Sequence, residues 1–341
     1  MHQIRKLIRE VNRTHKGLGE LLAMNVIAAK AKRCILNISP SGCGKSTATD
    51  TIACLLKDRA QRYDSLTLSG LCKLTTELTG YTGHVIIDDL GAEKSLWSRT
   101  STVSVLAHLV MQHQVVKITQ TTTVRISDFQ GAAALNIQPV MMGSIIGDDD
   151  WVAVIRDKVI RQYHLIRPVK PHKGLPNVNL DWGVNMHSIE EPKRTGMQWF
   201  QLVAEGLAQW SYGRCLIHLP EMLKAVAGLD GRDHCKKDDY VILAKLMKPM
   251  QLERFIIESF GFESGRIFNN NIMCILVEIA SWGEPTIETI AEDYKVHPKT
   301  VISLAGTAGE WCMISPDEPK RLIPTEQTKQ IFDRIGVNQK W

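Results

Sequence analysis

The stretch NISPSGCGKSTATD, residues 37–50, constrains the fold of this chain more than any other part of the sequence. It joins a short apolar run to a glycine-rich turn, and a Lys-Ser-Thr triplet then opens a segment of helical character. A turn of this kind presents successive backbone N–H groups at the start of a helix, where anions bind. The stretch therefore predicts a strand, a phosphate-binding loop and a helix, which together form the first unit of an α/β fold.

The loop follows the pattern GxxxxGK[ST], the P-loop, in its second half, whereas Ser39 stands where the pattern has its first glycine. In this pattern the lysine ammonium reaches the outer phosphates, and the hydroxyl that follows it binds Mg²⁺. ATP and Mg²⁺ are therefore the expected ligands, and the alternative is a Gly/Ser turn that only begins a helix. The residues expected to contact the nucleotide are Ser39, Ser41, Gly42, Cys43, Gly44, Lys45, Ser46 and Thr47.

An acidic pair, Asp88 and Asp89, ends the apolar run VIIDDLG. The carboxyl end of a parallel strand delivers such side chains to the crevice that holds the phosphates. We expect Asp88 and Ser46 to hold Mg²⁺, and Asp89 or Glu93 to orient the attacking water beside Lys45. A solvated turn after a strand is the alternative for either aspartate alone.

Short apolar runs alternate with helical stretches from residue 34 onward, and this alternation predicts a mostly parallel sheet covered by helices on both faces. The expected strands are 34–39, 65–70, 84–90, 115–120 and 138–146, with 161–168 as a further candidate. The expected fold class is α/β, a P-loop NTPase domain followed by a helical region and a small C-terminal domain.

Changes in composition divide the chain into five predicted regions. Residues 1–20 read as a basic N-terminal arm, in which Arg5, Lys6 and Arg9 are candidate phosphate contacts, and residues 21–168 as the P-loop domain. Residues 169–195 contain several prolines without a sustained period, which is typical of a linker. Residues 196–265 have helical periodicity, and residues 266–341 form the last region.

The motifs SPSGCGKST and VIIDDLGAEKS resemble those of AAA+ ATPases of the helicase-loader and insertion-sequence transposition type, which share a RecA-like core. The resemblance covers about residues 20–125. It implies a homo-oligomeric ring or filament and a helicase or transposase partner. It also implies a polar residue that senses the γ-phosphate at the end of the next strand. That role falls to Thr119 or Gln120, for which ordinary strand and turn positions are the alternative.

The same resemblance implies an arginine that reaches the nucleotide of a neighbouring subunit, where its fixed charge offsets charge in the transition state. Arg156 and Arg161 are the candidates, and Arg99 and Arg125 compete with them. A solvated basic face is the alternative. No clear arginine motif follows the expected sensor strand, so viral genome-packaging motors with a capsid partner stay open.

The segment from 270 to 336 has helix-turn-helix spacing, with Pro298 suited to the first position of the third helix. Two short apolar runs then flank PDEPK, so the segment resembles a winged-helix domain, which usually binds DNA through its third helix. The candidate DNA contacts are His297, Lys299, Thr300, Ser303, Lys320 and Arg321. Only Lys299 is basic on that helix, so a protein-contact or packing role is the alternative.

Composition adds a weak preference for a polyanionic partner, because the formal net charge is +5. The eight cysteines are scattered singly, which predicts reduced thiols. The longest apolar stretch, 131–147, is interrupted by polar residues and proline, so we expect no membrane partner. Residues 1–17 are basic and lack the uninterrupted apolar core of a signal peptide, so we expect a cytoplasmic location, in the host if the protein is viral.

The sequence therefore predicts an ATPase that engages DNA in replication, transposition or viral genome handling. A winged-helix regulator with an ATP switch is the non-enzymatic alternative. A small-molecule kinase is disfavoured because no arginine-rich lid segment occurs, and a GTPase because no Asn-Lys-x-Asp motif occurs.

Overall fold

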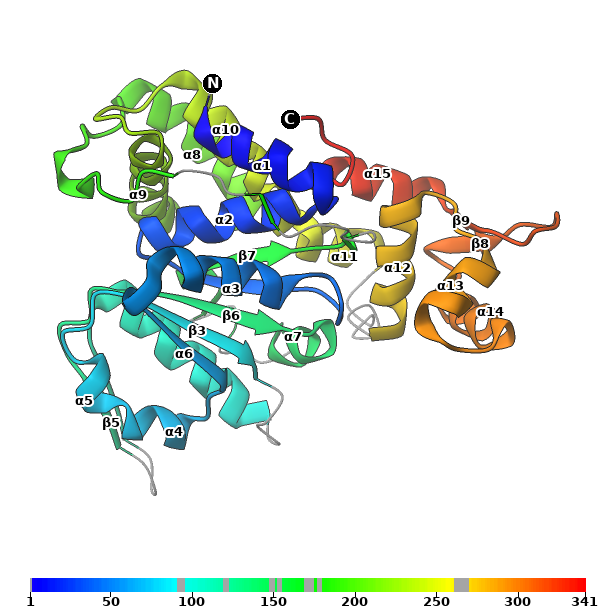
Figure 1. Cartoon of the computed structure of the whole chain (residues 1–341), viewed down its shortest axis with the longest axis horizontal. Coiled ribbons are helices and arrows are strands. Elements are labelled where there is room, and N and C mark those ends of the chain that lie inside the picture. The colour runs from blue at the N-terminus through cyan, green and yellow to red at the C-terminus, as the bar shows by residue number, and fades with distance from the viewer. Residues whose placement is uncertain are drawn as a thin grey trace.

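The computed structural model describes residues 2–90, 96–118, 123–146, 151, 155–168, 175–176, 180–260 and 270–341. At its centre lies a five-stranded parallel sheet in the order β2-β3-β6-β1-β7 (Figure 1). The strands are β1 (Cys34–Ile38), β2 (Ala60–Ser65), β3 (His84–Asp89), β6 (Ala132–Ile137) and β7 (Val159–Tyr163). The fold is α/β and has the strand, loop and helix arrangement of a P-loop NTPase.

Alternation along the central strands sends side chains to two separate apolar cores. Ile35 and Ala134 join the core beneath α2 (Leu18–Lys30) and α3 (Lys45–Leu56), whereas Leu36 belongs to the core on the other face. Helix α6 (Leu96–Gln112) covers that other face, as Figure 1 shows. The central strands are thus buried on both sides, as a parallel sheet requires.

Two of the predicted strands are wrong, and a third is a strand that lies outside the main sheet. Residues 138–146 form helix α7 (Pro139–Ile146), which begins with proline at the position where a missing N–H does no harm. Residues 65–70 span the end of β2 and the start of α4 (Leu68–Lys73), which Thr67 caps by accepting the N–H of Gly70. Strand β4 (Val115–Ile118) pairs with β5 (Thr123–Ile126) as an antiparallel hairpin outside the main sheet.

The N-terminal segment does not form a separate arm. Helix α1 (Gln3–Thr14) buries Ile4, Leu7, Ile8 and Val11 in the core that it shares with α2 and α9 (Tyr212–Leu229). Its basic residues lie on the other side, where Arg5 pairs with Asp238 at 3.4 Å. The helix is amphipathic, so its apolar stripe fixes it to the body of the protein.

The helical region contains α8 (Arg194–Ala208), α9, α10 (Lys237–Met247) and α11 (Leu252–Phe260). The described part of the predicted linker is attached to the body, because Lys30 Nζ donates to the carbonyls of Trp182 and Val184, both at 2.8 Å. Shorter helices are α5 (Thr75–Leu78) and the 3-10 turns Lys57–Arg59, Arg156–Lys158, Met186–Ser188 and Lys248–Gln251.

Residues 270–341 form what we call the C-terminal unit. It contains α12 (Asn270–Trp282), α13 (Ile287–Tyr294), α14 (Pro298–Thr307), the hairpin β8 (Cys312–Ile314) and β9 (Leu322–Pro324), and α15 (Glu326–Ile335). Helix α14 begins at Pro298 and the hairpin flanks PDEPK, as the sequence predicts, and Thr286 and His297 cap α13 and α14. The apolar core of the unit is continuous with the core on the α6 side of the sheet. None of the helices in the described ranges combines the length and apolar character that a bilayer crossing requires.

Candidate nucleotide-binding site

The phosphate-binding loop lies between the end of β1 and the first turn of α3. Gly42 and Gly44 have φ angles of 78° and 85°, a left-handed conformation that favours glycine. A Cβ atom on Gly44 would also come within 2.8 Å of Leu18 Cδ1, so a larger residue there would require the Leu18 side chain to shift. Ser39, at the first glycine position of the pattern, is buried, and its N–H donates to the carbonyl of Ile137 at 3.3 Å. The loop therefore keeps its conformation although serine replaces the first glycine of the pattern.

Lys45 points back onto the loop that precedes it. Its ammonium donates to the carbonyl of Pro40 (2.8 Å), to the carbonyl of Ser39 and to Ser39 Oγ (3.2 Å). Burial lowers the pKa of Lys45. The ammonium thus lies among oxygen acceptors at the mouth of the loop, where phosphate oxygens can replace those acceptors.

The acidic pair lies at the carboxyl end of β3, beside the loop. Asp88 Oδ1 accepts from Asn136 Nδ2 at 2.6 Å, Asp88 also pairs with Arg62, and its carboxylate bonds to Ser46. Burial raises the pKa of Asp88, but the hydrogen bonds from Arg62 and Asn136 outweigh burial and hold the pKa below its usual range. An ionised carboxylate next to a serine hydroxyl is the oxygen donor set that Mg²⁺ prefers, so the residues fit this ion.

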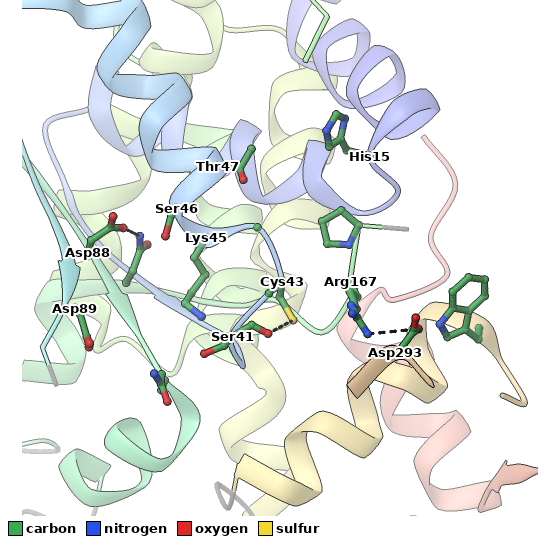
Figure 2. A pocket seen from close by; sticks show the side chains of 16 residues that line it. His15, Ser41, Cys43, Lys45, Ser46, Thr47, Asp88, Asp89, Arg167 and Asp293 are labelled. Carbon is green, nitrogen blue, oxygen red and sulfur yellow. Dashed lines mark hydrogen bonds and ion pairs between the residues drawn. The ribbon is translucent and has the colours of Figure 1, made fainter. Parts of the chain in front are cut away.

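These residues line a cavity of about 640 Å³ (Figure 2). The cavity brings together the predicted residues 41–47, Asp88 and Asp89. Ser39 is not among the residues that line the cavity, and Glu93 lies outside the described residues. Burial raises the pKa of Cys43 to about 12, so its thiol stays protonated and the residue contributes its backbone. The further lining residues, which sequence reasoning missed, are His15, Asn136, Gln138, Arg167, Pro168, Trp282 and Asp293.

The sheet order places polar residues other than the predicted sensors beside the loop. Thr119 and Gln120 lie outside the described residues, and the strand before them, β4, is not part of the main sheet. Strand β6 lies between β1 and β3 instead, and its carboxyl end carries Asn136 and Gln138 into the cavity. Asn136, the polar residue in the apolar run AAALNI, was the feature of the sequence from which a polar residue at this strand end could have been predicted.

A chain of buried amides supports Asp88 from behind. Asn37 Nδ2 donates to Asn136 Oδ1 and to Asn25 Oδ1, both at 3.0 Å, and Asn25 Nδ2 donates back to Asn37 Oδ1 at 2.9 Å. Asn136 Nδ2 is also 3.1 Å from Thr49 Oγ1 on α3. The network therefore joins α2, β1, β6 and α3 to the Asp88 carboxylate and fixes the orientation of that carboxylate.

We expect Asn136→Ala to lower the free energy of unfolding by about 1–3 kcal/mol, because Asn37 and Asp88 lose a buried partner. Mg²⁺-dependent nucleotide binding should weaken about 10- to 100-fold, because Asp88 loses its orientation. Urea denaturation and nucleotide titrations with and without Mg²⁺ measure the two effects. Asn338→Ala, at an exposed position, is the matched control. Unchanged values for Asn136→Ala would mean that the network does not position Asp88.

The arginine candidates lie in different environments. Arg161 is fully buried and donates to Glu253 Oε1 (2.8 Å) and to the carbonyl of Ala208 (2.6 Å), so the prediction that it reaches a neighbouring subunit is wrong. Arg156 is partly exposed at the amino end of β7, the opposite edge of the sheet from the loop. Arg125 is exposed on β5, and Arg99 lies in the first turn of α6.

Arg167 was not predicted, yet it connects the cavity to the C-terminal unit. Its guanidinium is 3.2 Å from Glu278 and 3.5 Å from Asp293, and it lies over the ring of Tyr294. Figure 2 shows Arg167 and Asp293 together on the side of the cavity away from Asp88. The wall of the cavity is therefore built partly from α12 and α13, far along the chain from the loop.

The candidate DNA contacts lie on the outer part of the C-terminal unit. His297 Nδ1 accepts the N–H of Lys299, and Arg321 donates to the carbonyl of Glu284 at 3.2 Å. Lys320 is half-buried and lies 4.0 Å from Glu318. The exposed residues of the set are His297, Lys299, Thr300, Ser303 and Arg321.

Comparisons with known proteins add little to this geometry. No protein-family model matches the sequence, and no curated protein matches it. Among solved structures, the chain is similar to a candidate ATPase from Cytophaga hutchinsonii, with 14% identity and a TM-score of 0.40, over 71% of this chain and 84% of that chain. At this level of similarity, the argument about function depends on the residues of the cavity.

Proposed function

We propose that the protein binds and hydrolyses ATP with Mg²⁺. The observation that carries the proposal is the single cavity in which Lys45 and Ser46 of α3 face Asp88 and Asp89 of β3. A P-loop lysine, a hydroxyl and an ionised carboxylate in one cavity form the combination that phosphoryl transfer uses. Supporting evidence comes from the strand order, because β6 carries Asn136 between the loop strand and the acidic strand.

Each residue has a role in this proposal. Lys45 contacts the outer phosphates, Ser46 and Asp88 hold Mg²⁺, and Asp89 orients the attacking water, with Glu93 as the alternative for that last role. When bound, Mg²⁺ neutralises charge that develops on the phosphate oxygens. The side of the cavity formed by His15, Pro168 and Trp282 offers ring surfaces to the nucleobase.

We further propose that the C-terminal unit is a winged helix that engages DNA through α14 and the β8–β9 hairpin. In support, α14 exposes Lys299, Thr300 and Ser303 on one helix beside the hairpin. ATP would then control assembly on DNA as a homo-oligomeric ring or filament, with Arg156 as the arginine candidate that acts on a neighbour. A helicase, a transposase or a capsid is the partner that this assembly would serve.

Salt dependence of DNA binding tests the second proposal. Lys299→Ala and Arg321→Ala should each weaken binding and reduce the slope of log affinity against log salt by about 1, because each removes one phosphate contact. Fluorescence anisotropy with labelled single-stranded and double-stranded DNA measures affinity. Lys73→Ala, an exposed lysine on α4, is the matched control. If both variants keep the affinity and slope of the parent, the DNA contact lies elsewhere.

A further inference from the structure

A second cavity, of about 660 Å³, lies at the amino ends of the strands, opposite the phosphate-binding loop. Its floor includes Arg33, which precedes β1, and His84, which begins β3. The last turn of α2, the start of α9 and residues 182–187 form its walls. No role in nucleotide binding accounts for this cavity.

Positive charge predominates among the lining residues, which include Lys30, Lys32, Arg33 and Arg59. Glu191 and Glu221 are the lining carboxylates. Both bond to Lys224, at 2.8 and 2.6 Å, so a cation that is not among the lining residues neutralises much of their charge. The cavity therefore favours an anionic ligand.

Several residues that line this cavity have buried polar atoms without a hydrogen-bond partner among the described residues. These atoms are Arg33 Nε, both ring nitrogens of His84, and Trp182 Nε1. Arg33 is 7% exposed and His84 is 1% exposed. Buried polar atoms almost always have partners in native proteins, and the arginine and indole nitrogens can only donate. A ligand with several acceptor oxygens could accept from Arg33 Nε, from Trp182 Nε1 and from the one N–H of a neutral His84 ring.

The donors are held in place by the surrounding backbone. Arg33 donates from its two terminal nitrogens to the carbonyls of Lys32 (3.0 Å) and Ile217 (2.9 Å), so Nε is the guanidinium nitrogen that has no partner among the described residues. Lys30 fixes the Trp182 segment through two carbonyls. Burial lowers the pKa of His84 to about 4, so its ring is neutral near pH 7 and offers one N–H. Positioned donors of this kind lose little entropy on binding.

We propose that this second cavity is a phosphate-binding site, in which Arg33, His84 and Trp182 donate hydrogen bonds at the base and Lys32 and Arg59 supply charge at the rim. A phosphate group matches the cavity better than a carboxylate does, because its three or more oxygens can serve donors that come from different sides. The phosphate can belong to a nucleic-acid backbone or to a free phosphorylated small molecule. The site does not depend on ATP hydrolysis.

Calorimetric titration of the full chain with pyrophosphate and with an oligothymidylate tests this site. We expect Arg59→Ala, an exposed rim position, and His84→Phe, which keeps a planar ring but removes the N–H, each to weaken pyrophosphate binding at least about tenfold. Lys45→Ala separates this site from the nucleotide cavity, and binding at the second cavity should survive it. Circular dichroism and urea denaturation establish that each variant is folded.

The two sources of phosphate give different results. If the oligothymidylate binds and Arg59→Ala weakens it equally, the site holds a nucleic-acid backbone; if pyrophosphate alone binds, the site holds a free phosphorylated molecule. The proposal would be overturned if Lys45→Ala abolished pyrophosphate binding while Arg59→Ala left it unchanged. It would also be overturned if neither pyrophosphate nor the oligothymidylate bound. If Lys45→Ala loses ATP hydrolysis but still binds pyrophosphate, the second cavity binds phosphate independently of the nucleotide cavity. Failure of one proposal can then be told apart from failure of the other.

Discussion

Lys45→Ala should lower the steady-state rate of ATP hydrolysis at least about 100-fold, because it removes a positioned charge that contacts the outer phosphates. The side chain lies among loop oxygens at the mouth of the P-loop, so its loss removes charge without disturbing the sheet. Phosphate release measured without nucleic acid, with single-stranded DNA and with double-stranded DNA gives the rate and its response to DNA. Lys237→Ala, an exposed lysine on α10, is the control.

The outcomes of this measurement separate the proposals. A rate in Lys45→Ala equal to that of the parent would mean that the cavity is not the site of hydrolysis. A Lys45-dependent rate that one form of DNA stimulates would support a DNA-coupled ATPase and identify its substrate. A Lys45-dependent rate that neither form changes would support the ATPase and argue against coupling to DNA.

Arg161→Ala should lower the free energy of unfolding by about 3–5 kcal/mol, because it leaves the Glu253 carboxylate buried without its cation. Arg161 and Glu253 are 0% and 3% exposed. Among the described residues, the carboxylate would keep the Tyr163 hydroxyl, which donates to Glu253 Oε1 at 2.5 Å, but no cation. Urea denaturation measures the loss. The measurement also decides whether this arginine is structural.

Arg156→Ala is the matched control, since Arg156 lies on the same segment and is partly exposed. It should change stability little. If Arg161→Ala is as stable as the parent and loses ATP hydrolysis only in the assembled state, the buried ion pair is unimportant and the arginine acts on a neighbour after all.

The two strands that carry the phosphate loop and the acidic pair could be predicted from the sequence, because each is an apolar run that ends in polar residues of recognisable type. Strand β6 could not, because its sequence, AAALNI, has three alanines, which disfavour strands in isolation. Its position between β1 and β3, buried on both faces beneath α2, decides its conformation. Tertiary packing overrides local preference there.

The same limit applies to the site. Residues 41–47 and the aspartates follow from local patterns, whereas Asn136, Arg167 and Trp282 enter the cavity only because distant segments meet. Pairing of β1 with β6 sets Asn37 beside Asn136, and this register is not visible in either strand alone. Nothing in the local sequence indicates that Arg161 is buried, because its burial depends on Glu253 and α8, which lie far along the chain.

The C-terminal unit contributes Trp282 and Asp293 to the wall of the nucleotide cavity. A shift of that unit would therefore change the cavity, and a ligand in the cavity would favour one position of the unit. Thermodynamic linkage makes such an effect reciprocal: if DNA bound to α14 changes the affinity for nucleotide by some factor, nucleotide must change the affinity for DNA by the same factor. A single coupling free energy, measurable by titrating either ligand, would then describe the linkage between the nucleotide cavity and the C-terminal unit.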